Sequence, residues 1–360
     1  MARGPDSLQN ALLARAVDKR VRFDHFMETV LYHPTLGYFS KEADRAGRSG
    51  DFLTSPEVAP LFGECVASWI ESVWTQVGRP TAFHVVEVGA GRGTLARSVT
   101  EATRPPLAEA LRLHLVERGK APRAAAAQGF QGDDRVRVYE NVDDLPQRLG
   151  AGAFVSNELF DNLPVRRIMR ADGWKEIVVR LSGQKVREEL VTASDDLVEA
   201  AQASGLELSE GQSAEFCPGA APLLESILRR FERGGLLIFD YGGEAHEVSG
   251  EAAPNGTLAA HRGHTAHPDL YSSLGDQDIT AHVNFTPLRA AAERLGYRPS
   301  HLVSQTRFLL ERGLPERLVQ RVEAEPDPFE KLRLSQFAKQ LYHPEAMGES
   351  FRALYATKAQ

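Results

Sequence analysis

The apolar positions of the chain alternate between helical and strand-like spacing. Apolar residues recur every three or four positions over 7–32, which predicts two short amphipathic helices that end near His33-Pro34. Further helices are expected over 58–77, 94–99, 196–204, 221–233 and 287–295. Apolar runs predict strands at 83–88, 111–117, 136–139, 153–157 and 235–241, with a hairpin from 167–170 and 176–181.

Strands separated by helices predict an α/β fold with a Rossmann-like, doubly wound and mostly parallel sheet. Residues 158–215 and 243–283 interrupt the alternation, and we interpret them as insertions that build the substrate side. The expected organisation has four parts. They are an N-terminal helical extension with a donor-covering loop (1–80), a core (81–157 and 221–315), an inserted substrate-side region (158–220) and a C-terminal helical region (316–360).

Composition excludes several classes of protein. The chain has 360 residues, 42% of them apolar and 25% charged, which is typical of a globular protein. It has no apolar run of the ~20 residues that a membrane span needs. Its net charge of -7 argues against a large nucleic-acid surface. Cys65 and Cys217 lie far apart and outside any metal-binding spacing, so we expect two idle thiols.

The most informative segment is His84 to Leu95, where an apolar run leads into three glycines and then a helical stretch. Strand, tight turn and helix start is the arrangement that holds a nucleotide-like ligand at the edge of a parallel sheet. The glycines Gly89, Gly91 and Gly93 are spaced G-x-G-x-G, and not in the dinucleotide pattern. Glu87 would repel a pyrophosphate but could receive a cation. The loop therefore favours S-adenosylmethionine, which carries a sulfonium and an ammonium.

Acidic residues end the following strands. Glu117 closes the strand after the glycine loop, where a carboxylate can accept hydrogen bonds from two ribose hydroxyls. Asn157 ends the strand predicted at 153–157, Glu158 and Asp161 follow it, and the two acids are three residues apart. If the turn is helical, the pair shares a face and could hold a guanidinium. The alternative is a solvated turn with a helix cap.

Two later motifs are candidates for the same site. Asp240-Tyr241-Gly242 ends a strand and could line the ligand crevice, or it could simply form a turn. His282 could be a general base that Asp278 orients, although a lone histidine is more often structural. The spacing of His261, His264 and His267 matches no zinc pattern, so no metal is expected.

Together these residues resemble the MidA-type class I methyltransferases, which are similar to a mitochondrial complex I assembly factor that methylates arginine. The resemblance spans about 23–315. Besides the glycine loop, Glu117 and 157–165, its blocks include 31–34, 37–39, 50–57, 62–64, 240–242, 256–258, 278–283 and 305–309.

The resemblance implies a Rossmann-like methyltransferase core with S-adenosylmethionine as its cofactor. It implies that the glycines hold the methionine part of the donor, that Glu117 holds the ribose and that Thr94 is a further cofactor-binding residue. The 157–164 turn would face the methyl group and the acceptor. Asn284 stands where we would expect an aspartate. Further residues that the resemblance places around the donor are Tyr38, Asp51, Thr54, Pro56, Glu57, Glu87, Asn141 and Asn157.

The expected activity is direct methyl transfer, which needs near-attack geometry more than covalent help from the protein. The leading hypothesis is methylation of arginine on a protein partner, such as a respiratory complex I-like subunit. The alternatives are a small-molecule O- or N-methyltransferase, with His282 as the base for a hydroxyl, and a non-catalytic assembly protein that keeps the donor pocket. We expect no nucleic-acid partner and leave a homodimer open. A bacterial cytoplasm is expected, or the mitochondrial matrix if the chain is organellar.

Overall fold

The computed structural model describes residues 7–41, 60–183, 185–262, 265–267, 269–343 and 348–359. The chain divides into two compact units. The first consists of 1–52, 160–223 and 242–288, and the second of 53–159, 224–241 and 289–360. The chain passes from one unit to the other within helices α9 (Ala220–Leu228) and α11 (Phe285–Arg294) and within strand β10 (Phe231–Gly243).

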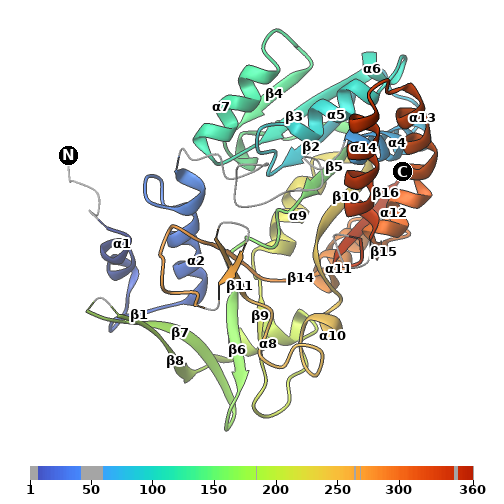
Figure 1. The fold of residues 1–360 in the computed structure, drawn as a ribbon. Coiled ribbons are helices and arrows are strands. Elements are labelled where there is room, and N and C mark those ends of the chain that lie inside the picture. The colour runs from blue at the N-terminus through green and yellow to red at the C-terminus, as the bar shows by residue number, and fades with distance from the viewer. Residues whose placement is uncertain are drawn as a thin grey trace. The chain divides into compact units, whose positions relative to one another are not determined.

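The second unit is built on a sheet in the order β15-β16-β10-β5-β2-β3-β4 (Figure 1). All neighbouring strands are parallel except β16, which is antiparallel to both β10 and β15. The strand order reverses direction between β2 and β5, where sheets of this type bind ligands beyond the carboxyl ends of the strands. The strands other than β10 are β2 (Phe83–Val88), β3 (Leu111–Val116), β4 (Val136–Tyr139), β5 (Gly150–Asn157), β15 (His301–Ser304) and β16 (Phe351–Lys358).

The predicted doubly wound sheet is therefore confirmed, but the prediction of a helical C-terminal region is wrong for its last part. Helices α13 (Leu314–Ala324) and α14 (Pro328–Tyr342) do form there. The chain then returns as β16 and enters the sheet between β10 and β15. Phe351, Ala353 and Leu354 are fully buried. A strand buried on both faces has a nearly continuous apolar pattern, and a short pattern of that kind cannot be told from a helix.

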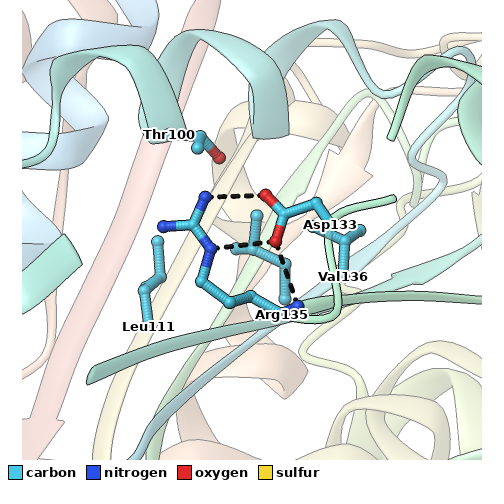
Figure 2. Close-up of a pocket in the computed structure, with 6 residues that line it drawn as sticks. Thr100, Leu111, Asp133, Arg135 and Val136 are labelled. Carbon is cyan, nitrogen blue, oxygen red and sulfur yellow. Dashed lines mark hydrogen bonds and ion pairs between the residues drawn. The ribbon is translucent and has the colours of Figure 1, made fainter. Parts of the chain in front are cut away.

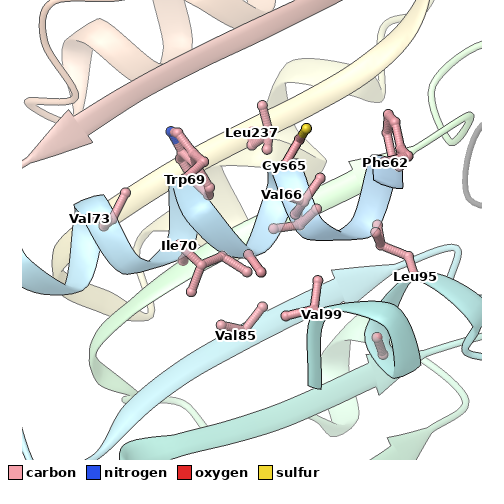
Figure 3. Packing of buried hydrophobic residues seen from close by; sticks show 14 of the residues in the cluster. Phe62, Cys65, Val66, Trp69, Ile70, Val73, Val85, Leu95, Val99 and Leu237 are labelled. Atoms are coloured by element: carbon pink, nitrogen blue, oxygen red, sulfur yellow. The ribbon is translucent and has the colours of Figure 1, made fainter. Parts of the chain in front are cut away.

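Helix α4 (Pro60–Gln76) lies in the centre of the second unit's core. Its apolar face packs against β2, β10 and helix α5 (Thr94–Ala102) through Trp69, Ile70 and Val73 (Figure 3). We expected α4 in the N-terminal extension, but it belongs to the core because these side chains cover the sheet. The unit's other helices are α6 (Leu107–Ala110), α7 (Lys120–Gly129), η2 (Val142–Asp144) and α12 (Gln305–Glu311).

The first unit has its own two sheets and its own core. One sheet has the order β1-β7-β6-β9 with β8 paired to β7, and the other has the order β12-β11-β13. Residues 242–288 belong to this unit together with 160–223, which agrees with the interpretation of 243–283 as an insertion but not with the core range 221–315. The strands are β1 (Arg20–Val21), β6 (Arg166–Arg170), β7 (Trp174–Ser182), β8 (Lys185–Thr192), β9 (Ser213–Phe216), β11 (Ala259–Arg262), β12 (Thr265–His267), β13 (Asp278–Thr280) and β14 (Val283–Asn284), which pairs with the end of β10. The helices are α1 (Leu8–Arg15), α2 (Phe23–Tyr32), η1 (Tyr38–Ser40), α8 (Asp195–Ala203) and α10 (Ala245–Val248).

The role of β16 can be tested with Leu354→Ala. Leu354 is fully buried, so its truncation should lower the free energy of unfolding by about 2–5 kcal/mol in urea titrations. The matched control is Leu332→Ala in α14, where the side chain is 58% exposed and the change should stay within about 0.5 kcal/mol. Equal effects of the two substitutions would contradict the placement of β16.

Candidate functional site

The glycine loop between β2 and α5 is tied to the end of β3 by its own backbone. The N–H groups of Gly89 and Ala90 both donate to the carbonyl of Val116, at 2.9 and 3.1 Å. The Gly93 N–H donates back to Ala90, and the Gly91 N–H donates to the Glu117 carboxylate at 2.9 Å. A loop that binds a pyrophosphate needs such N–H groups free. Because these four are already bonded within the protein, the loop suits a ligand without phosphate.

The three glycines are required for different reasons. All three have positive φ, between +53° and +76°, which other residues rarely adopt. A side chain at Gly93 would meet the ring of Phe130 at 2.9 Å, so this position needs glycine for packing. A side chain at Gly91 would meet nothing within 4 Å. Gly91 therefore borders open space, as expected of a surface that a ligand approaches closely.

Glu87 lies beneath the loop in an apolar environment. Its carboxyl group shares a small cavity with side chains of α4 and α5, including Val66, Ile70 and Leu95. Burial raises its pKa to about 8, and a hydrogen bond from the Ala96 N–H in the first turn of α5 acts in the opposite direction. Glu87 thus supports the start of α5. Its predicted contact with a ligand cation remains a prediction.

Glu117 is held at the end of β3 by two backbone donors. Its Oε2 accepts from Gly91 and its Oε1 accepts from the Gly119 N–H at 2.6 Å. Burial raises its pKa, and these hydrogen bonds oppose the shift. Each carboxylate oxygen has two acceptor positions, so with respect to the described residues one on each oxygen remains for a further donor. Two adjacent acceptors match the two hydroxyls of a ribose.

The turn after β5 is anchored to β10. Glu158 donates its N–H to the Phe239 carbonyl at 2.9 Å, and Leu159 donates its N–H to Oδ2 of Asp240 at 3.1 Å. Asp240 is fully buried and also accepts from the Tyr241 N–H at 3.0 Å. The sequence left two roles open for Asp240, lining the crevice or forming a turn. The structure shows instead that it holds the backbone of the turn.

Glu158 has a strained backbone. Its φ is +53°, in the left-handed region where a residue other than glycine costs about 1 kcal/mol or more. Its side chain accepts from the Asn157 amide at 2.8 Å, while Oδ1 of Asn157 is buried and has no partner among the described residues. Residues with a strained backbone of this kind are found preferentially at functional sites. The sequence did not reveal it, because nothing in the pattern marks a non-glycine residue at positive φ.

Asp161 follows in the first unit, where β13 and the segment after it hold its backbone. The Asp161 carbonyl accepts from the Ala281 N–H at 2.9 Å. The amide of the next residue, Asn162, donates to Oδ1 of Asp278 at 2.8 Å and to the Ile279 carbonyl at 3.2 Å. Asp278 was expected to orient His282, and the structure shows it engaged with Asn162. The sequence had marked Asp278 but not this partner.

The Asp161 carboxylate is buried and only partly satisfied. The residue is 4% exposed, and its Oδ1 has no hydrogen-bond partner among the described residues. Burial raises its pKa to about 7, while the N–H groups of Asp161 and Asn162 oppose the shift. An unpaired buried acceptor is costly and calls for an explanation. A ligand that donates a hydrogen bond to Oδ1 would explain why the protein keeps this carboxylate.

His282 is exposed, and its backbone N–H donates to the hydroxyl of Thr257 at 2.9 Å. Desolvation lowers the pKa of its imidazole, which keeps the ring neutral and able to accept a proton at pH 7. Asn284 donates from its side chain to the Ser204 carbonyl at 2.8 Å. His264 lies outside the described residues, and among those described no cluster of His, Cys, Asp or Glu could hold a metal ion.

Three of the remaining predicted donor contacts lie in the described part of the chain. Tyr38 is fully buried in the first unit's core, with its ring edge against Phe39. Asn141 caps η2 in a reciprocal pair with Asp144. Thr94 is the first residue of α5. Asp51, Thr54, Pro56 and Glu57 lie outside the described residues.

A small pocket beside β4 has a structural role. Figure 2 shows Arg135 bound to both carboxylate oxygens of Asp133, at 2.9 and 2.6 Å. Arg135 also donates to the Ala108 carbonyl at 3.0 Å. The guanidinium is occupied by these contacts, and the rest of the lining is largely apolar. The pair fixes the start of β4.

Comparison with known proteins identifies the family. Residues 65–303 match the model of a family of S-adenosyl-L-methionine-dependent methyltransferases. The chain belongs to this family. The match covers the glycine loop, Glu117, the turn after β5 and the Thr257–His282 region, so the predicted resemblance and the predicted cofactor are confirmed.

Individual relatives agree with this assignment. The chain is 29% identical to the human mitochondrial protein arginine methyltransferase NDUFAF7, over 91% of this chain and 77% of that protein. It is 31% identical to the Drosophila melanogaster homologue, over 75% of this chain and 66% of the homologue. A crystal structure from Burkholderia thailandensis with bound S-adenosyl-homocysteine is similar, with a TM-score of 0.84 and 30% identity, covering 100% of this chain and 95% of that one.

The methyltransferase uses S-adenosylmethionine, and its own residues fit this cofactor. Gly91 borders open space, Glu117 keeps two acceptor positions, and Oδ1 of Asn157 is a buried acceptor without a partner among the described residues. The acceptor atoms of Glu117 and Asn157 can take hydrogen bonds from a ribose and an ammonium. None of these contacts requires a phosphate group. Within the described ranges, no helix has the length and apolar character needed to span a bilayer.

Gly91→Val tests the glycine loop. The new side chain would enter the open space beside the loop, so donor affinity should fall at least about tenfold in calorimetric titration, which corresponds to ~1.4 kcal/mol. Gly132→Val is the matched control, because Gly132 also has a positive φ, +86°, and an equally open surrounding. It carries the same kind of backbone strain away from the loop. Similar donor binding by both variants would contradict the assignment.

Asp161→Asn tests the cost of the buried carboxylate. Because its folded-state pKa is raised, the contribution of Asp161 to wild-type stability should fall as pH rises from about 4, the ordinary value, to about 7, and then stay constant. Relative to wild type, the variant should gain about 2–4 kcal/mol of unfolding free energy at pH 8 and little at pH 4. Denaturant titrations at both pH values measure this gain. The exposed control Asp143→Asn should show no such pH-dependent gain, and a pH-independent effect of Asp161→Asn would contradict the argument.

Proposed function

We propose that this methyltransferase transfers a methyl group to an arginine side chain of a protein. The observation that carries the proposal is Asp161, on the turn that follows β5, whose buried carboxylate has one oxygen without a hydrogen-bond partner in the described part of the chain. The relatives named protein arginine methyltransferases support it, at 29–31% identity. The protein partner of this chain is thus defined by its chemistry, an accessible guanidinium.

A guanidinium matches Asp161 in charge and geometry. It is planar, carries five N–H donors and pairs with carboxylates through two parallel hydrogen bonds. Asp161 would accept such donors, fix the plane of the group and draw electron density to one nitrogen. With a pKa of about 7, it can also take up the proton that the nitrogen loses.

The donor would be held by the second unit. S-adenosylmethionine supplies, when bound, a methyl group on a positively charged sulfur. Glu117 would accept from the ribose, and Asn157 would accept from the ammonium with its buried Oδ1. Gly89, Gly91, Gly93 and Thr94 would line the methionine part, because no side chain at Gly91 obstructs the approach. In this proposal the residues of the chain bind and orient the donor and the acceptor, and they accept the proton that the acceptor nitrogen loses.

His282 favours one alternative, methylation of a hydroxyl or amine on a small molecule. Its neutral, exposed imidazole could act as the base for a hydroxyl, which needs deprotonation more than orientation. Arginine remains our proposal because Asp161 is a buried carboxylate that matches the charge and the planar donors of a guanidinium, and a neutral hydroxyl offers neither.

The experiment is methyl transfer from labelled S-adenosylmethionine to a desalted whole-cell protein extract, followed by acid hydrolysis and separation of amino acids. We expect the label in methylated arginine. Asp161→Asn should reduce labelling about a hundredfold while donor affinity stays within about threefold, because the donor-binding residues are elsewhere in the chain.

Two controls make the result decisive. Gly91→Val sets the background for labelling without donor binding, and a parallel reaction with the small-molecule fraction tests the alternative. Label in other amino acids, in small molecules only, or no label above the Gly91→Val background would each contradict the proposal.

A further inference from the structure

The segment Gly256-Thr257-Leu258 is part of the family resemblance, but the proposed function gives it no role. In the structure it lies in the first unit beside the Ala281–His282 turn. Its contacts link the two candidate groups of that unit, Asp161 and His282.

Two consecutive backbone amides make this link. Ala281 donates its N–H to the carbonyl of Asp161 at 2.9 Å, and His282 donates its N–H to Oγ1 of Thr257 at 2.9 Å. A change in the direction of this turn would therefore move the imidazole of His282 and the backbone of Asp161 together.

Thr257 is itself held by a buried carboxylate. Oε2 of Glu215 in β9 accepts from the Thr257 N–H at 2.8 Å and from its hydroxyl at 3.4 Å. The hydroxyl can donate to Glu215 and still accept from His282, so one group bridges both. A side chain at Gly256 would lie 2.2 Å from Oε1 of Glu215, which explains a glycine with φ of +79° at this position.

A buried arginine supports Glu215 from the other side. The Nε of Arg167 in β6 lies 3.6 Å from Oε1 of Glu215, and the two side chains are 9% and 3% exposed. Arg167 also pairs with Glu188 and lies over the ring of Phe23, 5.0 Å from its centroid. Buried ion pairs of this kind contribute little net stability, because desolvation offsets their attraction. The contact between Arg167 and Glu215 is electrostatic and is not a hydrogen bond, so Arg167 acts on Glu215 through its charge.

We infer that Thr257 is a positioning residue of the acceptor site, held by Glu215 and Arg167, which orients the Ala281–His282 turn and through it Asp161. The inference rests on the proposed function in placing the acceptor at these residues. The link depends on the hydroxyl of Thr257, and a shape-conserving substitution can remove that group alone.

The test compares Thr257→Val with Thr257→Ser. Valine keeps the shape and removes the acceptor for the His282 N–H, whereas serine keeps the hydroxyl. We expect valine to lower the maximal rate of label transfer about tenfold or more, with the KM for the donor unchanged within twofold. Serine should restore the rate to within about twofold of wild type.

Thr29→Val is the matched control in the same unit. Thr29 is buried and its hydroxyl donates to the His25 carbonyl at 2.7 Å, a hydrogen bond with no link to the Ala281–His282 turn. It should leave the rate within twofold. Thr257→Ala provides a second removal of the hydroxyl, without an added methyl group, should the valine variant fold poorly.

The imidazole resonance of His282, assigned with His282→Gln, gives a readout that needs no acceptor. It should shift in Thr257→Val and Thr257→Ala and stay in place in Thr257→Ser and Thr29→Val. If wild type binds the donor but labels no arginine, the proposed function fails, and this spectrum still decides the inference. Equal rates in the valine and control variants, equal loss in valine and serine, or an unmoved His282 resonance would each overturn it.

Discussion

The hydrogen bonds between the glycine loop and the end of β3 are the constraint on which the proposed donor site depends. The carbonyl of Val116 and the carboxylate of Glu117 take up the N–H groups of Gly89, Ala90 and Gly91. This arrangement fixes the loop before any ligand binds, so little ordering cost remains for binding. It also removes the donors that a phosphate would need, which separates this loop from the dinucleotide-binding loops of similar sheets.

Candidate site residues in both units carry carboxyl groups whose burial or backbone conformation lowers the stability of the fold. Glu87 and Asp161 are buried with raised pKa values, and Glu158 has a left-handed backbone. Each feature costs free energy that a neutral or smaller residue would not. Structures tolerate such costs where binding or catalysis uses them. Oδ1 of Asp161, which has no hydrogen-bond partner among the described residues, is the observation on which the proposed acceptor site rests.

Much of the fold could be predicted from the sequence, because the strands of a parallel sheet are buried on both faces and form clear apolar runs. The predicted bounds of β2 and β4 agree with the structure. The same argument failed for β16, whose place in the sheet depends on contacts with β10 and β15 far away in the chain. For the site, spacing marked Glu117, Glu158 and Asp161 as candidates. It could not show that Asp240 holds a backbone or that Asp278 binds Asn162, since these pairs are more than 80 residues apart.

The central claim is that the glycine loop and Glu117 form a binding site for a phosphate-free methyl donor. The most direct test is calorimetric titration of the wild-type protein with S-adenosylmethionine and, separately, with NAD. The account predicts saturable binding of S-adenosylmethionine at one site and no measurable binding of NAD, because the loop N–H groups near Val116 and Glu117 are already bonded. Binding of NAD with equal or higher affinity would contradict it.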